Sequence, residues 1–371
     1  MKLCHFSDSH LGAGENHPRR GASGLTERQE DAIRSFTEAV DRIIEIRPDL
    51  CIHSGDLFHA VRPLNRLMAI AAEQLHRLAS LADIPTVIIS GNHDTPRQPY
   101  VGAPLEVLSQ IDNLYVAACG KLEVFQILGG KVFALPHCLS TTDLAAELAR
   151  CEPDSSAAFN VLVMHGVAAG MPEFSMADLG EQEIPLDVMD RFDYTALGHY
   201  HNFRQVTDRA WYAGSTERLS QAERDAAKGF AVVNLQPLQV TMHEVHAREM
   251  VLLDEIDAGS MRGDELARLM RVRIEQGASS DKIVKLKVTN VAPETLNTLP
   301  VEELAALKEK YFAVDISFEK APGADESLQF GRSAIGRLDQ AFVDYLEQTD
   351  LGAFDRERLL DLALQYLRSE E

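Results

Sequence analysis

The chain alternates between short apolar runs and longer segments with helical spacing. Apolar runs at 2–6, 50–53 and 85–90 predict buried strands. Between them, residues 27–46 place Ile33, Phe36, Val40 and Ile43 on one helical face, and residues 63–82 follow a similar pattern. Strands that alternate with helices predict an α/β arrangement, in which functional groups gather where strands end.

The pattern changes further along the chain. Strands dominate at 114–137, 160–165, 194–198, 211–213 and 229–245. From about residue 250, predicted strands at 251–256, 283–288 and 314–318 alternate with predicted helices at 263–275 and 301–311. Residues 327–371 have the pattern of two amphipathic helices, and the Gly- and Pro-rich residues 11–26 predict a long loop. We therefore expect three units, at 1–248, 249–325 and 326–371.

Composition narrows the class of protein. Hydrophobic residues make up 45% of the 371 residues and charged residues 25%, which is ordinary for a globular chain. No apolar run reaches the ~20 residues that a membrane helix needs, and the N-terminus lacks the apolar core of a signal peptide. The five cysteines are scattered with no CxxC pair, so we expect free thiols and a cytoplasmic location.

The formal net charge of −21 argues against nucleic-acid binding through the overall field of the protein. The acidic residues are unevenly distributed, however. Residues 1–100 hold 11 basic and 13 acidic side chains, whereas residues 151–200 hold 1 and 9, and residues 301–350 hold 5 and 11. The segment that carries most of the candidate chemistry is therefore close to neutral.

Five polar clusters each follow a predicted strand. They are Asp8-Ser-His10; Gly55-Asp56 with His59 beyond it; Gly91-Asn92-His93-Asp94; His165-Gly166; and Gly198-His199-Tyr-His201. Their carboxylate, imidazole and amide donors suit Mn²⁺, Fe²⁺ or Zn²⁺ better than Ca²⁺. Seven candidate ligands are too many for one ion and fit two ions that share a carboxylate. Taken alone, each cluster also has an ordinary interpretation, as a turn or as a buried core histidine.

The order of these clusters resembles the calcineurin-like metallophosphoesterase superfamily over residues 1 to about 215. Within it, Phe6-Ser-Asp-Ser-His-Leu-Gly, His53-Ser-Gly-Asp-Leu-Phe-His59, Ala196-Leu-Gly-His-Tyr-His201 and Tyr212-Ala-Gly-Ser215 are similar to the bacterial SbcD-type DNA double-strand-break repair exonucleases. The resemblance implies a four-layer β-sandwich flanked by helices, a small α/β capping domain and a C-terminal helical pair. It also implies a Mn²⁺-dependent exonuclease with 3′–5′ polarity. Whether an endonuclease activity accompanies it is left open by the sequence.

The resemblance also implies residue roles. Asp8, His10 and His201 would hold one metal ion, Asn92, His165 and His199 the other, and Asp56 would bridge them. The two ions would be Mn²⁺, with Mg²⁺, Fe²⁺ or Zn²⁺ as alternatives. His93 would face the scissile phosphate, and His59 would lie near the bound nucleotide. Asp94 would either orient His93 or cap a turn.

DNA would be held through its backbone. Arg97, just past His93, and Arg204, just past His201, are the preferred phosphate contacts, with Arg19 and Arg20 in the first loop and basic residues of the capping domain as further candidates. Each of these side chains could equally be a solvated surface charge.

The C-terminal helices have apolar stripes, at Ile335, Leu338 and Phe342 and again at Leu359, Leu360 and Leu364. Either they pack on the capping domain or, as the resemblance implies, they dock on the coiled coil of an SMC-like ATPase of the SbcC type. The chain has no Walker A motif, so an ATP motor would lie on another chain. The family also forms homodimers, and no membrane partner is expected.

Two other functions compete with the nuclease. One is a calcineurin-like phosphodiesterase or phosphatase that acts on small nucleotides, against which the long second region and tail argue. The other is a scaffold that has kept the fold and lost the chemistry, against which the complete set of ligands argues.

Overall fold

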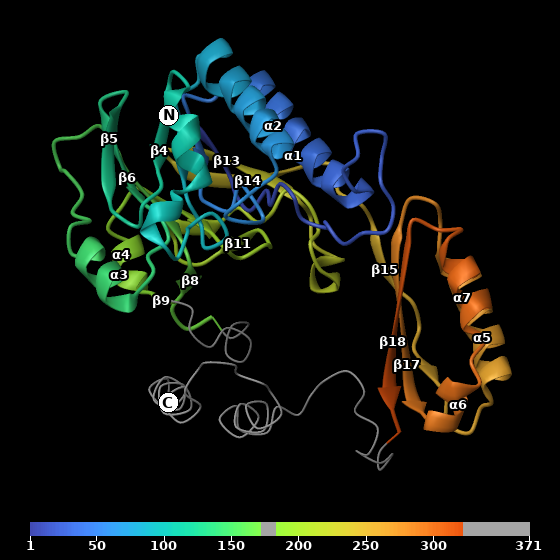
Figure 1. The fold of residues 1–371 in the computed structure, drawn as a ribbon. Helices are drawn as coiled ribbons and strands as arrows, with labels where there is room; N and C mark the ends of the chain where they lie inside the picture. The colour runs from blue at the N-terminus through green and yellow to red at the C-terminus, as the bar shows by residue number, and fades with distance from the viewer. Residues whose placement is uncertain (172–182, 322–371) are drawn as a thin grey trace, which may run out of the picture.

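A computed structural model describes residues 1–171 and 183–321 (Figure 1). Its first sheet has six strands in the order β14-β13-β1-β2-β3-β4. The neighbours β1 to β4 are parallel, whereas β13 and β14 are antiparallel. The bounds are β1 Lys2–Phe6, β2 Leu50–His53, β3 Thr86–Ile89, β4 Leu114–Ala117, β13 Gly229–Leu235 and β14 Leu238–Glu244.

The second sheet also has six strands, in the order β11-β12-β10-β7-β6-β5. Its central strands β6, β7, β10 and β12 are parallel. The bounds are β5 Glu123–Ile127, β6 Gly130–Leu135, β7 Asn160–His165, β10 Tyr194–Gly198, β11 Arg204–Gln205 and β12 Ala210–Tyr212. A two-stranded sheet of β8 (Val167–Ala168) and β9 (Glu183–Ile184) lies beyond β7.

The two large sheets pack face to face, with helices on both outer faces (Figure 1). Leu3, Ile52, Val87, Val161 and Ala196 belong to the core between the sheets. The first sheet packs against α1 (Glu27–Ile46) and α2 (Asn65–His76), and the second against α3 (Thr141–Leu148) and α4 (Leu186–Met189). The expected four-layer α/β sandwich is confirmed.

The long loop at 11–26 ends where α1 begins. Thr26 caps the helix, because its side chain accepts from the backbone N–H of Gln29 while the Gln29 side chain accepts from the backbone N–H of Thr26. Thr26 also donates to the carbonyl of Gly14, and Gln29 donates to that of Gly12. The start of α1 therefore fixes the loop beside the end of β1.

The third sheet holds four parallel strands, with β17 pairing with β15, β16 and β18. Its core is shared with α5 (Gly263–Gly277), α6 (Pro293–Asn297) and α7 (Val301–Lys308). The bounds are β15 Met250–Leu252, β16 Ile256–Asp257, β17 Ile283–Val291 and β18 Ala313–Lys320. The single strand expected at 251–256 is thus two strands, and the helix expected to reach 311 ends at Lys308. The break between β15 and β16 and the end of α7 both fall among polar residues, where hydrophobic periodicity gives little information on where an element ends.

In Figure 1 this α/β unit stands beside the sandwich and is joined to it at β15.

The helix expected at 63–82 is α2 followed by a π-helical turn, Arg77–Leu81. The expected C-terminal helices at 327–371 lie outside the described residues. Among the described helices, none combines the length and the apolar character needed to span a bilayer.

Candidate dinuclear metal centre

The predicted polar clusters meet where the parallel strands of both large sheets end. Asp8, Asp56 and Asn92 follow β1, β2 and β3, which are neighbours in the first sheet. His165 ends β7, and His199 follows its parallel neighbour β10 in the second sheet. Because both sheets present these ends at one edge of the sandwich, side chains far apart in sequence come together there.

The seven candidate ligands form two groups around one carboxylate. In the first, Nε2 of His10 lies 3.2 Å from Nε2 of His201, and each is 3.9 Å from Oδ1 of Asp8. Oδ2 of Asp56 lies 3.5 Å from Nε2 of His10 and 3.4 Å from Nε2 of His165. Asp56 is therefore almost equidistant from the two groups.

In the second group, the side-chain oxygen of Asn92 lies 2.9 Å from Nε2 of His165 and 3.2 Å from Nδ1 of His199. All of these are oxygen or nitrogen donors, and Asp8, His10 and Asp56 are almost fully buried. Buried carboxylates and imidazoles that converge on one point are costly without a cation between them. The donor set fits two divalent ions, with Asp56 between them.

The backbone at this edge is strained. Asp8, His10 and Asp56 have φ angles of 51°, 43° and 55°, and His199 has 102°. Non-glycine residues with such angles are uncommon and cluster at functional sites. The backbone N–H of His199 donates to both carboxylate oxygens of Asp8, at 3.1 Å, so the strained turn is tied to a candidate ligand.

Two glycines allow the sheets to approach closely beneath His165. A Cβ on Gly198 would lie 2.2 Å from the carbonyl oxygen of Ser54 and 2.4 Å from Oγ of Ser7. Gly55 has a φ of 108°, and a Cβ there would lie 2.3 Å from Nδ1 of His165. In the space that these glycines leave, Nδ1 of His165 bonds to the Ser54 carbonyl at 2.9 Å, which leaves Nε2 facing the centre.

Burial and charge set the protonation of the site. Burial raises the pKa of Asp8. Burial would also raise the pKa of Asp56, but the neighbouring His165 and His10 outweigh it and hold that pKa well below the usual range. Burial lowers the pKa of His199 to about 3. Asp56 is therefore an anion and His199 a neutral ring, while the Asp56 carboxylate outweighs burial and raises the pKa of His165 to about 9, so a metal ion must displace a proton there.

His93 lies beside the first group, oriented by the backbone of His59. Its Nδ1 donates to the carbonyl oxygen of His59 at 3.0 Å, so its Nε2 is the atom left to exchange a proton with a substrate. The backbone N–H of His93 donates to Oδ1 of Asp56 at 2.9 Å. The His59 ring stacks on the His93 ring with centroids 5.2 Å apart, and its Nδ1 lies 3.2 Å from Nδ1 of His10.

Asp94 does not orient His93. Its carboxylate accepts from the backbone N–H groups of Leu57 and Phe58, both at 2.9 Å, and from that of Gly91 at 3.4 Å. The expected catalytic role is therefore corrected to the other interpretation, a turn-capping carboxylate. It ties the loop after β2 to the loop after β3, and so fixes Asp56 and Asn92 relative to each other.

The expected substrate contacts lie at the rim. Arg97 is exposed just past His93. Arg204 lies in β11 with its guanidinium 5.9 Å from the centre of the Tyr200 ring. A groove of about 700 Å³ begins at His59 and is lined by Arg20 and by Arg62, which sequence reasoning missed. Arg62 lies three residues past His59, and its position just after the Asp56–His59 cluster is the sequence signal that could have found it.

Sequence reasoning also missed the residues behind His201. Oε1 of Glu223 lies 3.1 Å from Nδ1 of His201, and the fully buried Lys228 donates to Oε2 of Glu223 at 2.6 Å. Neither residue lies in a glycine- or histidine-rich cluster. The sequence signal that could have found them is a lysine within a segment that enters the buried strand β13.

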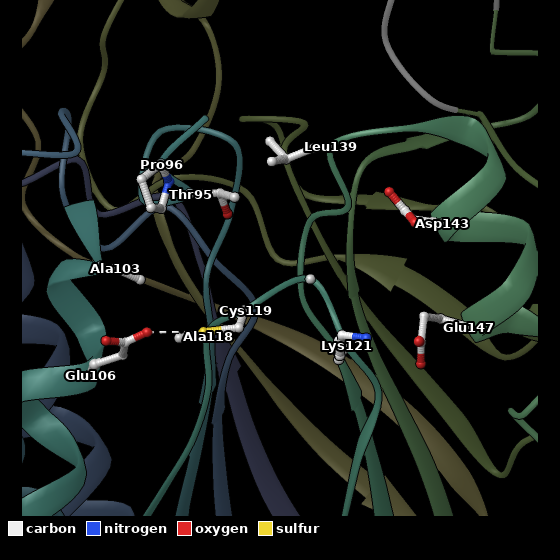
Figure 2. Close-up of a pocket in the computed structure, with 12 residues that line it drawn as sticks. Thr95, Pro96, Ala103, Glu106, Ala118, Cys119, Lys121, Leu139, Asp143 and Glu147 are labelled. Carbon is white, nitrogen blue, oxygen red and sulfur yellow. Dashed lines mark hydrogen bonds between the residues drawn. The ribbon is translucent and has the colours of Figure 1, made fainter. Parts of the chain in front are cut away.

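A second cavity, of about 260 Å³, is lined in part by Thr95 and Pro96, just past His93 (Figure 2). Thr95 and Pro96 line it together with Glu106, Cys119 and Lys121. The Cys119 thiol donates to Glu106 at 2.9 Å. None of the seven candidate ligands lines this cavity, so it is separate from the candidate metal centre.

Comparison with known proteins identifies the family. The model of the calcineurin-like phosphoesterases matches residues 1–203, more than half of the chain. The chain belongs to the calcineurin-like phosphoesterase family. The matched residues contain β1, β2, β3, β7 and β10 and all seven candidate ligands, so the resemblance inferred from the sequence is confirmed.

Proteins similar to this chain include DNA repair proteins of archaea. The DNA double-strand break repair protein Mre11 of Methanococcus maripaludis is 32% identical over 251 residues, which cover 63% of each chain. The protein of the same name from Saccharolobus solfataricus is 25% identical over 385 aligned positions, covering 100% of this chain and 96% of its own. That from Haloferax volcanii is 27% identical over 312 residues, or 81% of this chain and 65% of its own. The match to the Methanococcus protein thus spans less than two thirds of that protein's length.

Proposed function

We propose that the chain is a metal-dependent nuclease that hydrolyses phosphodiester bonds of DNA in double-strand break repair. The observation that carries the proposal is the position of Asp56, whose Oδ2 lies 3.5 Å and 3.4 Å from ligand nitrogens of two separate groups. The relatives named as DNA double-strand break repair proteins support the substrate class. The carboxylate, imidazole and amide donors favour Mn²⁺, with Mg²⁺, Fe²⁺ or Zn²⁺ as alternatives.

Each side chain has a proposed role. Asp8, His10 and His201 would hold one ion, Asn92, His165 and His199 the other, and Asp56 both. Two bound divalent ions would polarise the phosphate and lower the pKa of a water molecule between them. His93, with its Nδ1 proton held by the His59 carbonyl, would act as the doubly protonated imidazolium, whose Nε2–H would stabilise the phosphate and pass its proton to the leaving oxygen.

The groove beside His59 provides the proposed path for the DNA backbone. Arg20 and Arg62 line it next to the exposed face of the His59 ring. Guanidinium groups suit phosphate because they are planar and always charged. Arg97 and Arg204 are proposed as further phosphate contacts at the rim. An exonuclease with 3′–5′ polarity is the proposed form of the activity, with an endonuclease activity as an addition.

The rest of the chain has proposed roles in assembly. We divide the chain into a nuclease unit (1–248), a capping unit that helps to hold DNA (249–325) and C-terminal helices (326–371) that dock on an SMC-like ATPase of the SbcC type. The apolar stripes of the tail and the lack of a Walker A motif support the last proposal. The chain is proposed to be a homodimer in the cytoplasm, and its five free thiols suit a reducing compartment.

The test is digestion of end-labelled DNA by the purified full chain with Mn²⁺. We expect the chain to shorten linear duplexes. EDTA should abolish this digestion, and the Asp56→Asn variant should not show it. Labels at the 3′ and 5′ ends report the polarity. If the chain instead hydrolyses bis-p-nitrophenyl phosphate or small nucleotides and leaves DNA intact, the nuclease proposal is wrong and a small-molecule phosphodiesterase replaces it.

A further inference from the structure

A buried pair of opposite charges lies directly behind His201. The ammonium group of Lys228 makes three contacts, to the carbonyl oxygen of His201 at 2.7 Å, to Oγ of Ser215 at 2.9 Å and to Oε2 of Glu223 at 2.6 Å. Three N–H donors thus meet three acceptors. The Lys228 side chain is 0% exposed and that of Glu223 is 7% exposed, so solvent does not compete for these bonds.

Glu223 holds the ring of His201, whereas Lys228 holds its backbone carbonyl. Its Oε1 lies 3.1 Å from Nδ1 of His201, and Ser220 donates to the same oxygen at 3.0 Å. Because a carboxylate only accepts hydrogen bonds, the proton of His201 must be on Nδ1. Nε2 then carries the lone pair, and it faces Nε2 of His10 at 3.2 Å.

We propose that Glu223 and Lys228 are positioning residues for the metal centre: the Glu223 carboxylate fixes the tautomer and ring angle of His201, and the Lys228 ammonium fixes its backbone. The inference rests on the proposed function and adds to it two residues that contact no substrate. Histidines that bind metal ions commonly donate their second N–H to such a carboxylate, and loss of that partner weakens metal binding about 10- to 100-fold.

His201 needs such support more than His10, the other histidine of its group. Its side chain is 28% exposed, against 1% for His10. Its backbone is held through the carbonyl oxygen, which accepts from the backbone N–H of Ser215 at 3.0 Å and from the Lys228 ammonium at 2.7 Å. Packing therefore restrains the ring of His201 less than that of His10, and the bond to Glu223 supplies a further restraint.

The experiment separates positioning from simple stabilisation of the fold. Glu223→Gln leaves the Lys228 ammonium buried without a counter-charge, which destabilises a protein whatever else the pair does. The double variant Glu223→Gln/Lys228→Met removes both charges at similar volume. Its thermal unfolding, measured without metal, is expected to return close to that of the wild-type chain.

Metal binding is the decisive measurement. Isothermal titration of the full wild-type chain with Mn²⁺ is expected to show two binding events. In the double variant we expect one event to weaken about 10- to 100-fold while the other stays unchanged. The control is Asp31→Asn in α1, which removes the buried carboxylate that pairs with Arg28, Arg34 and Arg248, none of which is a candidate ligand. It should lower the unfolding temperature and leave both binding events unchanged.

Four results would overturn the inference. A double variant with wild-type affinity at both sites shows that the pair does not position His201. Equal weakening of both events, or weakening of the same size in Asp31→Asn, shows a general effect of stability. A wild-type chain that binds no Mn²⁺ removes the proposed function as well, so the two failures are distinguishable.

Discussion

At the residue scale, His93 differs from the ligands around it. Its Nδ1 donates to the His59 carbonyl, and its backbone N–H donates to Oδ1 of Asp56, the proposed bridging ligand. The ring itself is therefore free to act on a substrate, whereas the backbone contact does not depend on the side chain. A substitution of the ring should leave the ligands in place.

We expect His93→Ala to keep both Mn²⁺ ions and to lower DNA cleavage about 10²- to 10⁴-fold, the usual contribution of a proton donor. Titration with Mn²⁺ and single-turnover cleavage measure the two properties separately. Asp56→Asn is the comparison, since it should lose metal as well as activity. Cleavage at the wild-type rate by His93→Ala would show that another group protonates the leaving oxygen.

His5 gives a separate prediction on acid stability. It lies between the sheets, where Nδ1 bonds to the Tyr194 hydroxyl and Nε2 to the Ser54 hydroxyl, both at 2.8 Å. Burial lowers the pKa of His5 to about 3 in the folded chain, against about 6.5 for a histidine in water. Below pH 6.5 the unfolded chain therefore binds a proton that the folded chain excludes.

The sign follows from this difference. Above pH 6.5 both states are neutral at this position, and between pH 6.5 and about 3 the free energy of unfolding falls by about 1.4 kcal/mol per pH unit from this residue. We expect His5→Gln to be less stable at pH 8 but to lose stability less steeply on acidification. Denaturant unfolding from pH 8 to pH 4 measures the slope. An unchanged slope would mean that other buried histidines account for the acid sensitivity.

At the element scale, the end of β10 shows how tightly the two sheets meet. Gly198 is the last residue of β10, and a methyl group there would overlap Ser54 and Ser7 in the turns of the first sheet. The flexible end of a side chain could move, but the Ser54 carbonyl belongs to the backbone and also holds His165. A larger residue must therefore separate the strand ends.

We expect Gly198→Ala to destabilise the chain by about 1–3 kcal/mol, as overpacking does, and to weaken Mn²⁺ binding. The second effect follows because His199 is the next residue and His165 lies under the same contact. Gly129→Ala, in the exposed turn between β5 and β6, is a control for glycine replacement outside the candidate metal centre: its φ of 78° means that it should cost stability only. Unchanged metal binding in Gly198→Ala would show that the strand ends adapt.

Elements and ligands were accessible from the sequence to different degrees. The strands that lead into the candidate ligands were predictable, because each is a short apolar run followed at once by polar residues. These ligands are Asp8, Asp56, Asn92, His165 and His199. The contacts of Asp94 were not, since its partners are backbone groups of another loop. Glu223 and Lys228 act across a turn whose path sequence periodicity does not reveal. The break within 251–256 depends on pairing with β17, which is a long-range property.

At the scale of the whole molecule, the charge is distributed unevenly. The net charge is −21, yet residues 1–100, which supply Asp8, Asp56 and the loop groove, hold 11 basic and 13 acidic side chains. An acidic protein repels DNA at a distance. DNA binding must therefore come from local contacts at the groove. The overall field should speed the release of DNA, and a more basic partner protein would offset the repulsion.

This distribution makes the salt dependence of DNA binding informative. Each phosphate contact releases counterions, so the loss of one contact should flatten the plot of log affinity against log salt by about one. We expect Arg62→Ala, in the groove beside His59, to show this change on every DNA sequence. Arg150→Ala removes the same charge from an exposed side chain just after α3, where Arg150 pairs with the buried Glu147 and does not line the groove, and it should leave the slope unchanged. Fluorescence anisotropy measures the DNA affinity of both variants, with labelled duplexes in a buffer that contains Ca²⁺. The salt concentration is varied from about 50 to 300 mM, roughly the range over which such slopes are resolved. Parallel slopes for the two variants would place the DNA path elsewhere on the molecule, with Arg97 and Arg204 as the next positions to test.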